Sequence, residues 1–215
     1  MTPARGAAAP IKAVFFDFDG VLTTDKTGST TTTRHISQRT GIALPAVKAA
    51  FARHNAALTL GRTTHENVWP RICDDLGRPL DISLLQEAFE STPLNEPMFA
   101  LARRLKRAHV VGIITDNKKD RIDWLRRRHG LDALFDPVLV SAEVGSDKGD
   151  PAIFLAALRG AGVRPTEAVF IDNSEDNLAA PRALGMKACF HDDVANDIDA
   201  LIAKLQEFGV VVGDA

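Results

Sequence analysis

The chain carries an apolar strand pattern, Ala13–Phe18, whose end is marked by two acids and a glycine: Asp17, Asp19 and Gly20. An apolar run without alternation predicts a strand that is covered on both faces, as in a parallel sheet. Asp17 and Asp19 lie two positions apart, so their side chains leave the strand on the same face unless the backbone turns. Two carboxylates this close repel each other unless a cation or a proton lies between them. The run therefore predicts a parallel sheet with a charged site at the end of its first strand.

Four more apolar runs follow, and helical patterns separate them. The runs are Val110–Ile114, Pro137–Val140, Ala168–Ile171 and Lys187–Phe190. The helical patterns are Met98–Ala108, Lys118–His129, Asp150–Arg159, Asn177–Leu184 and Asn196–Phe208. This alternation predicts an α/β fold, a doubly wound parallel sheet with right-handed crossovers and helices on both faces.

One region interrupts the alternation, because residues 25–92 contain no convincing strand. Its helical patterns are Pro45–Leu60, Thr64–Leu76 and Ile82–Glu90, whereas the biased stretch Thr27–Thr33 is expected to form a loop. We therefore predict an α/β core domain of residues 1–24 and 93–215 and an inserted α-helical cap domain of residues 25–92. Ligands of open α/β sheets lie beyond the carboxyl ends of the strands, so an insert at this position would cover the site as a lid.

Charge and composition exclude several classes of protein. The chain has 26 Lys and Arg against 28 Asp and Glu, so it lacks the basic excess of a nucleic-acid-binding domain. Its two cysteines, Cys73 and Cys189, form neither a disulfide scaffold nor a zinc motif. The apolar runs are too short to span a membrane, and the N-terminus, where residues 1–10 are expected to form a loose tail, lacks a signal-peptide core. We expect a cytoplasmic protein that binds neither nucleic acid nor membranes.

Three later segments place polar side chains where strands are expected to end. Thr115-Asp116-Asn117 follows the second strand, Lys148 lies within Ser141–Phe154, and Asp172–Asp176 follows the fourth strand. Taken singly, these segments also suit a turn, a surface cation and an acidic helix N-terminus. Bound Mg²⁺ at Asp17 and Asp19 would relieve the repulsion between the two acids and polarise a phosphate.

Jointly and in order, these segments resemble the four motifs of the haloacid dehalogenase-like hydrolase superfamily. Phe15–Leu22 resembles the opening DxDx[TV], and Val110–Thr115 resembles the apolar strand that ends in Ser or Thr. Ser141–Phe154 resembles SxxxGxxKPDPxIF, with Gly149 in place of the first proline, and Phe170–Met186 resembles the acidic loop that ends in AxxxGM. The insert resembles the small cap of the branch that includes phosphoglycolate phosphatase and the N-terminal phosphatase of epoxide hydrolase.

The resemblance implies catalytic roles for three residues and substrate-binding roles for two more. Asp17 would be the nucleophile that forms an aspartyl-phosphate, and Asp19 would protonate the leaving oxygen and later activate water. The Thr115 hydroxyl and the backbone N–H of Asp116 would bind phosphoryl oxygens. Lys148 would offset the negative charge that builds up around Asp17.

The resemblance also implies a Mg²⁺ site made by Asp17, the backbone carbonyl of Asp19 and the loop with Asp172 and Asn173. Asn173 stands where the family usually has a metal-binding aspartate. An amide oxygen can bind Mg²⁺ but brings no charge, so the metal affinity could be lower. Asp172, or Asp176 under a shifted alignment, would then be the source of the missing carboxylate.

The function implied by the resemblance is that of a Mg²⁺-dependent phosphatase acting on a small phosphorylated metabolite, such as a sugar phosphate or phosphoglycolate, as a monomer or homodimer. Asp19 favours a phosphatase over a dehalogenase, because dehalogenases of the family lack the second acid. Two alternatives stay open. One is a sugar phosphomutase of the same fold, and the other is a non-catalytic phospholigand-binding protein, which Asn173 and Gly149 would suit.

Overall fold

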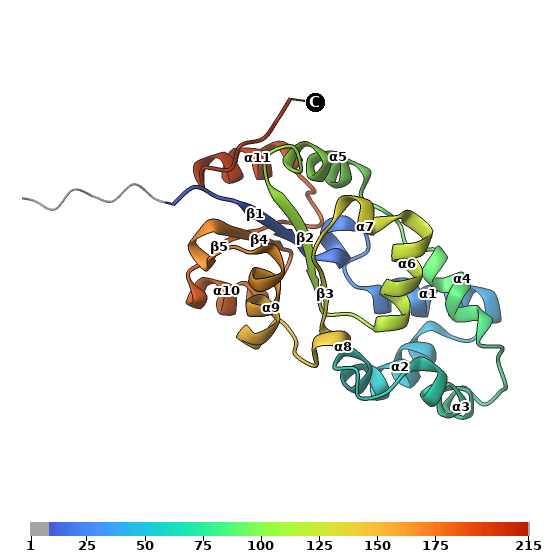
Figure 1. The fold of residues 1–215 in the computed structure, drawn as a ribbon. Coiled ribbons are helices and arrows are strands. Elements are labelled where there is room, and N and C mark those ends of the chain that lie inside the picture. The colour runs from blue at the N-terminus through green and yellow to red at the C-terminus, as the bar shows by residue number, and fades with distance from the viewer. Residues whose placement is uncertain (1–8, 215) are drawn as a thin grey trace, which may run out of the picture.

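Five parallel strands form one sheet at the centre of the computed structural model, which describes residues 9–214 (Figure 1). The strands are β1 (Ala13–Phe16), β2 (Val110–Thr115), β3 (Val138–Val140), β4 (Ala168–Asp172) and β5 (Lys187–Phe190), in the order β3-β2-β1-β4-β5. The predicted doubly wound α/β fold is confirmed. The strand order reverses between β1 and β4, and in such sheets the ligand crevice lies beyond the carboxyl ends of the strands at this point.

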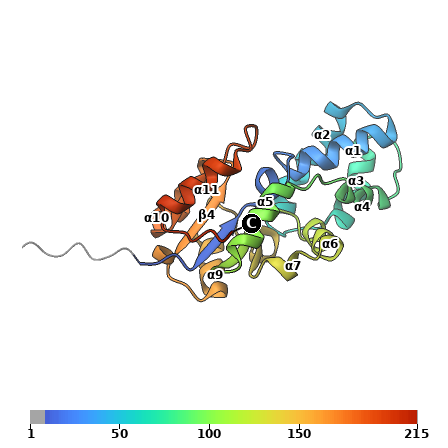
Figure 2. The same cartoon turned by 90° about the horizontal axis from the view of Figure 1, so that it is seen from above.

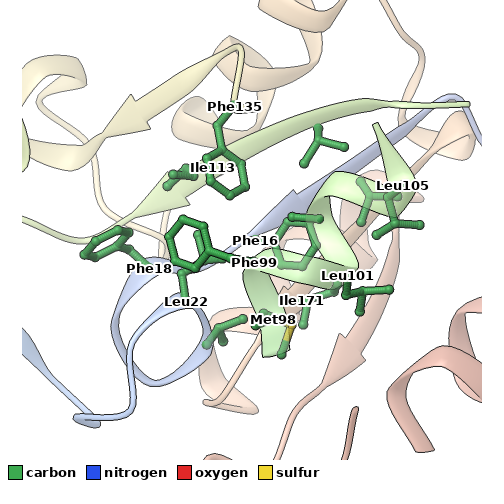
Figure 3. Packing of buried hydrophobic residues seen from close by; sticks show 14 of the residues in the cluster. Phe16, Phe18, Leu22, Met98, Phe99, Leu101, Leu105, Ile113, Phe135 and Ile171 are labelled. Atoms are coloured by element: carbon green, nitrogen blue, oxygen red, sulfur yellow. The ribbon is translucent and has the colours of Figure 1, made fainter. Parts of the chain in front are cut away.

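Helices cover both faces of the sheet, which explains why the strands read as continuous apolar runs. Val14 and Phe16 of β1 face one hydrophobic cluster, Ala13 and Phe15 face another, and all four are fully buried. Figure 3 shows the first cluster, in which Phe16 lies among Met98, Leu101 and Phe135. The first face is covered by α5 (Glu96–Leu105), α6 (Lys119–His129), α7 (Leu131–Leu134) and α11 (Ile198–Glu207), and the second by α9 (Pro151–Ala161) and α10 (Ala179–Leu184).

Four helices make up the insert after β1, and they gather beside α6, away from α10 and α11 (Figures 1 and 2). They have a hydrophobic cluster of their own, which includes Ile36, Phe51, Ile72 and Phe89. The helices are α1 (Gly28–Thr40), α2 (Leu44–Thr59), α3 (His65–Asp75) and α4 (Ser83–Glu90).

The expectation of a loop at Thr27–Thr33 is wrong, because α1 begins at Gly28. Thr27 caps this helix by accepting a hydrogen bond from Thr30 N. Thr31 donates to Asp25, and Thr33 donates to the carbonyl of Ser29 one turn earlier. Buried threonine hydroxyls thus find partners inside the helical conformation, which lowers the cost of helix for these β-branched residues.

Two adjacent backbone segments connect the insert with the rest of the chain. Thr23 and Leu94 form an antiparallel bridge, and Thr24 N donates to the carbonyl of Pro93 at 3.0 Å. The insert therefore starts and ends at neighbouring points, beside the carboxyl end of β1. The division into a core domain and a cap domain stays a prediction. Over residues 9–214, no helix is long and apolar enough to cross a membrane.

Candidate active site

The residues predicted for the site lie where β1, β2 and β4 end. Asp17 directly follows β1, Thr115 ends β2 and Asp172 ends β4. The registers that pair Phe16 with both Ile113 and Ile171 place these three strand ends at one edge of the sheet. The sheet topology therefore brings together side chains that are 57 to 155 positions apart in the sequence.

A tight helical turn, Phe18–Leu22, carries the chain away from β1. Gly20 in this turn has a φ of 78°, a left-handed conformation that glycine adopts without steric cost. A Cβ at this position would also collide with the side-chain amide of Asn173. Gly20 is thus needed both for the turn and for the close approach of the loop after β4.

Lys148 joins two of the predicted carboxylates. Its Nζ lies 2.8 Å from Asp17 Oδ1 and 2.7 Å from Asp172 Oδ2, and all three side chains are buried. Burial, together with the nearby negative charges of Asp172 and Asp19, raises the pKa of Asp17 to about 8 although Lys148 lowers it. Asp17 and Asp172 raise the pKa of Lys148 above its ordinary value, against the effect of burial. The buried ammonium of Lys148 thus opposes the rise in the pKa of Asp17 that burial causes.

The oxygens of Asp17 are not equivalent. Oδ1 accepts hydrogen bonds from Phe18 N at 2.7 Å and from Lys148, whereas Oδ2 takes part in neither contact. Asp172 is held by its own loop: its Oδ1 accepts from Ser174 N, and Asn177 donates to both of its oxygens. Lys148 and Asn177 therefore fix Asp172, and Asp17 keeps one oxygen for chemistry.

The segment after β2 lies against the same cluster. Asp116 Oδ1 accepts a hydrogen bond from Lys148 N at 3.0 Å, and burial raises the pKa of Asp116. Asn117 Nδ2 lies 3.3 Å from Thr115 Oγ1 and donates to Asp19 Oδ2 at 2.8 Å. Asp116 therefore positions the loop that carries Lys148, a role that differs from the phosphate-binding role expected for its backbone N–H but does not conflict with it.

Asp19 has a partner that the sequence analysis missed. Arg121, the third residue of α6, is 2 % exposed, and its Nη1 and Nη2 donate to Asp19 Oδ2 and Oδ1 at 2.8 and 2.9 Å. Arg121 also donates to Thr92 and to Asn117, and its guanidinium lies over the Phe18 ring. A bidentate guanidinium–carboxylate pair fixes the orientation of both groups.

A signal for Arg121 exists in the sequence. The buried positions of α6 are Arg121, Ile122 and Leu125, so an arginine stands on the apolar face of the helix. A charged residue at a core position is rare unless it is paired, and the four-residue spacing from Asn117 places both side chains on one side of the helix start.

The donors expected for Mg²⁺ fit a hard cation by type, since Asp17, the Asp19 carbonyl and Asn173 all offer oxygen. Asn173 is 8 % exposed and packs over Gly20, next to the turn that carries Asp17 and Asp19. Asp176 is exposed at the start of a short 3-10 helix, and Asp172 is engaged by Lys148. In residues 9–214 no three His, Cys, Asp or Glu side chains form a metal-ligand group, so the donor set is a mixed one with fewer charges.

Comparisons with known proteins indicate a family. The family model described as haloacid dehalogenase-like hydrolase matches residues 11–185. A protein named Phosphatase MT3486 from Mycobacterium tuberculosis is 29 % identical over 218 residues, which cover 95 % of this chain and 98 % of that protein.

Solved structures show the same fold. A HAD family enzyme from Bacteroides thetaiotaomicron superimposes with a TM-score of 0.73 at 21 % identity, over 90 % of this chain and 99 % of that one. The same enzyme was also solved in complex with magnesium and inorganic phosphate, and that structure has a TM-score of 0.69 at 21 % identity, over 89 % and 98 % of the two chains.

Proposed function

The chain belongs to the haloacid dehalogenase-like hydrolase family, and on this basis we propose that it is a Mg²⁺-dependent phosphatase that hydrolyses a small phosphorylated metabolite through an aspartyl-phosphate at Asp17. The observation that carries the proposal is the buried contact of Lys148 with Asp17 and Asp172 at the ends of adjacent strands. The relative named as a phosphatase and the neighbouring structure with magnesium and phosphate support it.

In the first half-reaction, the free carboxylate oxygen of Asp17 attacks phosphorus while the bond from phosphorus to the ester oxygen breaks. Asp19, in its protonated form once a contact with Arg121 has opened, gives its proton to the departing oxygen, so the product leaves as an alcohol. Lys148 lies against Asp17 and offsets the negative charge that gathers on the phosphoryl group, and the Thr115 hydroxyl with the N–H of Asp116 donates to its oxygens.

In the second half-reaction, Asp19, now a carboxylate, takes a proton from water as the water oxygen attacks the phosphorus of the aspartyl-phosphate. The bond from phosphorus to Asp17 breaks, inorganic phosphate leaves, and both acids return to their starting states. Mg²⁺, when held by Asp17, the Asp19 carbonyl and Asn173, would supply positive charge to the phosphoryl oxygens. The insert of residues 25–92 would act as a cap that keeps bulk water from the aspartyl-phosphate.

The proposal is tested by hydrolysis of p-nitrophenyl phosphate with and without Mg²⁺. The wild type should release p-nitrophenol only with Mg²⁺, and Asp17→Asn should lower kcat by at least about 10³-fold, because an amide cannot serve as the nucleophile. Asn173→Asp should lower the Mg²⁺ concentration for half-maximal rate by about tenfold, since it adds a carboxylate to the donor set.

Three results would count against this function. Turnover at the wild-type rate in Asp17→Asn would show that Asp17 is not the nucleophile. A rate that does not respond to Mg²⁺ would show that the enzyme does not depend on this metal. If the wild type and Asn173→Asp are both silent with ample Mg²⁺, a non-catalytic phospholigand-binding protein becomes the better description, and phosphate binding should then be measured directly.

A further inference from the structure

A pocket of about 350 Å³ lies between the insert and the start of α6. Phe51, Leu58 and Phe89 form its apolar wall, and the first residues of α1 form another wall. Arg121 lines the pocket on the side of Asp19, so one side chain separates the pocket from the proposed proton donor. The pocket is therefore placed where the group attached to the ester oxygen would extend away from Asp17.

The charged side chains that line this pocket are cationic. Lys118 and Arg121 line its interior, and the exposed Lys48 stands at its rim. The guanidinium of Arg121 is already paired with Asp19, and His65 is bonded to Asp120 at 2.7 Å. Within residues 9–214, neither Lys48 nor Lys118 forms an ion pair with a carboxylate, although Asp19, Asp116 and Asp120 act on Lys118 from a greater distance.

A neighbouring pocket has a different charge pattern. It has a volume of about 640 Å³ and shares Leu58, Phe89 and Lys118 with the smaller pocket. Its lining residues include both signs of charge, among them the carboxylates Glu66, Asp81, Asp120 and Asp123. No Asp or Glu contributes to the wall of the smaller pocket in the part of the chain that the structure describes.

Two helix N-termini add to the positive potential of the smaller pocket. Gly28, Ser29 and Thr30 open the 13-residue helix α1, and Lys118 immediately precedes the 11-residue helix α6. The backbone N–H groups and the macrodipole of a helix start favour a negative charge. Thr32, Thr33 and Asn55 add neutral hydrogen-bonding groups to the wall.

The environment of Lys118 shows the cost of leaving this charge without a counterion. Burial, followed by repulsion from Arg121, lowers the pKa of Lys118 to about 8, although Asp19, Asp116 and Asp120 act in the opposite direction. An anion in the pocket would face Lys118 directly and favour its charged form.

From these observations we propose that the pocket binds the leaving group of the substrate and selects phosphate monoesters that carry a second small anionic group, a carboxylate or a second phosphate. This assignment rests on the proposed function and adds the class of substrate to it. Lys118 is the principal anion-binding residue, and Lys48 contributes from the rim.

Two matched pairs of esters test the assignment. In the first pair, 3-phosphoglycerate has a carboxylate where glycerol 3-phosphate has a hydroxymethyl group. In the second pair, fructose 1,6-bisphosphate has a second phosphate that fructose 6-phosphate lacks. We expect kcat/KM to favour the doubly anionic member of at least one pair by about tenfold or more, which is the contribution of one ion pair between the ligand and a lysine. The pair that shows the preference identifies the anionic group.

Lys118→Met should reduce this preference by about tenfold, because it removes the charge but keeps most of the aliphatic side chain. Lys119→Met is the matched control. It removes the same charge at the next position, but Lys119 is exposed and already paired with Asp123 and Glu143. The control should keep the preference of the wild type.

Calorimetry measures the binding of the same esters to the Asp17→Asn variant. This measurement tests the anion selectivity of the pocket independently of the proposed phosphatase activity. If p-nitrophenyl phosphate is hydrolysed but both pairs give ratios near one in kcat/KM and in Kd, the pocket does not select anions and the assignment is overturned. If no ester is hydrolysed, the proposed function fails, and the ratios of Kd alone decide whether the pocket prefers the doubly anionic member.

Discussion

Both carboxylate oxygens of Asp19 are bonded to Arg121, yet the proposed mechanism requires one of them to exchange a proton with the ester oxygen. One contact with Arg121 or Asn117 must therefore give way when the substrate arrives. Arg121 is at the same time in contact with Thr92 and packed against Gly28, at the two ends of the insert. Arg121 thus links the orientation of Asp19 to the position of the insert.

We predict that Arg121→Lys lowers kcat by about 10²-fold with a smaller change in KM, because a lysine keeps the charge but cannot hold both oxygens of Asp19 in one orientation. Steady-state kinetics on p-nitrophenyl phosphate, with urea unfolding alongside, measures this. In Arg121→Ala, added guanidinium ions should restore part of the rate. A well-folded Arg121→Lys variant with wild-type kcat would show that the pair is structural only.

At the residue scale, the acids were identified because they lie where strands are expected to end, and Lys148 was identified by the resemblance of Ser141–Phe154 to a family motif. Asp17, Lys148 and Asp172 do come together, and their roles stay predictions. Arg121 was missed because its pairing with Asp19 is a tertiary contact. The guanidinium reaches Asp19 only because α6 packs against the turn after β1. The residues next to Asp19 in the sequence do not indicate that an arginine pairs with it.

At the scale of elements, the strands and most helices follow from apolar periodicity, while α1 does not. Its first residues are glycine, serine and threonines, which favour a loop when taken by composition. The helix forms because Thr27 caps it and because Asp25 accepts from Thr31 and pairs with Arg34. These contacts join residues up to nine positions apart and depend on side-chain geometry, which cannot be predicted from the composition of the segment.

The ends of α2 and α3 allow a controlled test of the contact between the insert and the helix that follows β3. Gly61 and Gly77 follow these helices at equivalent positions with φ of 66° and 71°, so alanine should cost each about 1 kcal/mol of backbone strain. A Cβ at Gly61 would also strike the backbone carbonyl of Ala142 in α8 (Ser141–Val144), whereas a Cβ at Gly77 meets open space.

We therefore predict that Gly61→Ala lowers the free energy of unfolding by about 1–3 kcal/mol more than Gly77→Ala does. Urea unfolding of the two variants measures the difference. Equal losses of stability would mean that the approach of Gly61 to Ala142 is not maintained in solution.

At the scale of the whole molecule, the sequence predicts a parallel sheet, the alternation of strands and helices along the chain and the position of the insert in the sequence. It does not predict how the insert packs against the rest of the molecule. Tertiary contacts fix its position, among them His65 with Asp120 at 2.7 Å and Ser141 Oγ with the carbonyl of Thr59 at 2.7 Å. The pocket that Lys48 and Lys118 line forms where α1 and α2 meet the start of α6. Such a surface cannot be inferred from periodicity, because it is made by two segments far apart in the sequence.

The central claim is that Asp17 is the residue that becomes phosphorylated, and trapping the phosphoryl-enzyme tests it most directly. Asp19→Asn should slow hydrolysis of the intermediate, because water then lacks its base. After reaction with p-nitrophenyl phosphate and Mg²⁺ and an acid quench, mass spectrometry should find one added phosphoryl group on the peptide that contains Asp17. The adduct should be missing from the Asp17→Asn and the doubly substituted proteins. An adduct on another residue, or Mg²⁺-dependent turnover with no adduct in any variant, would contradict the account.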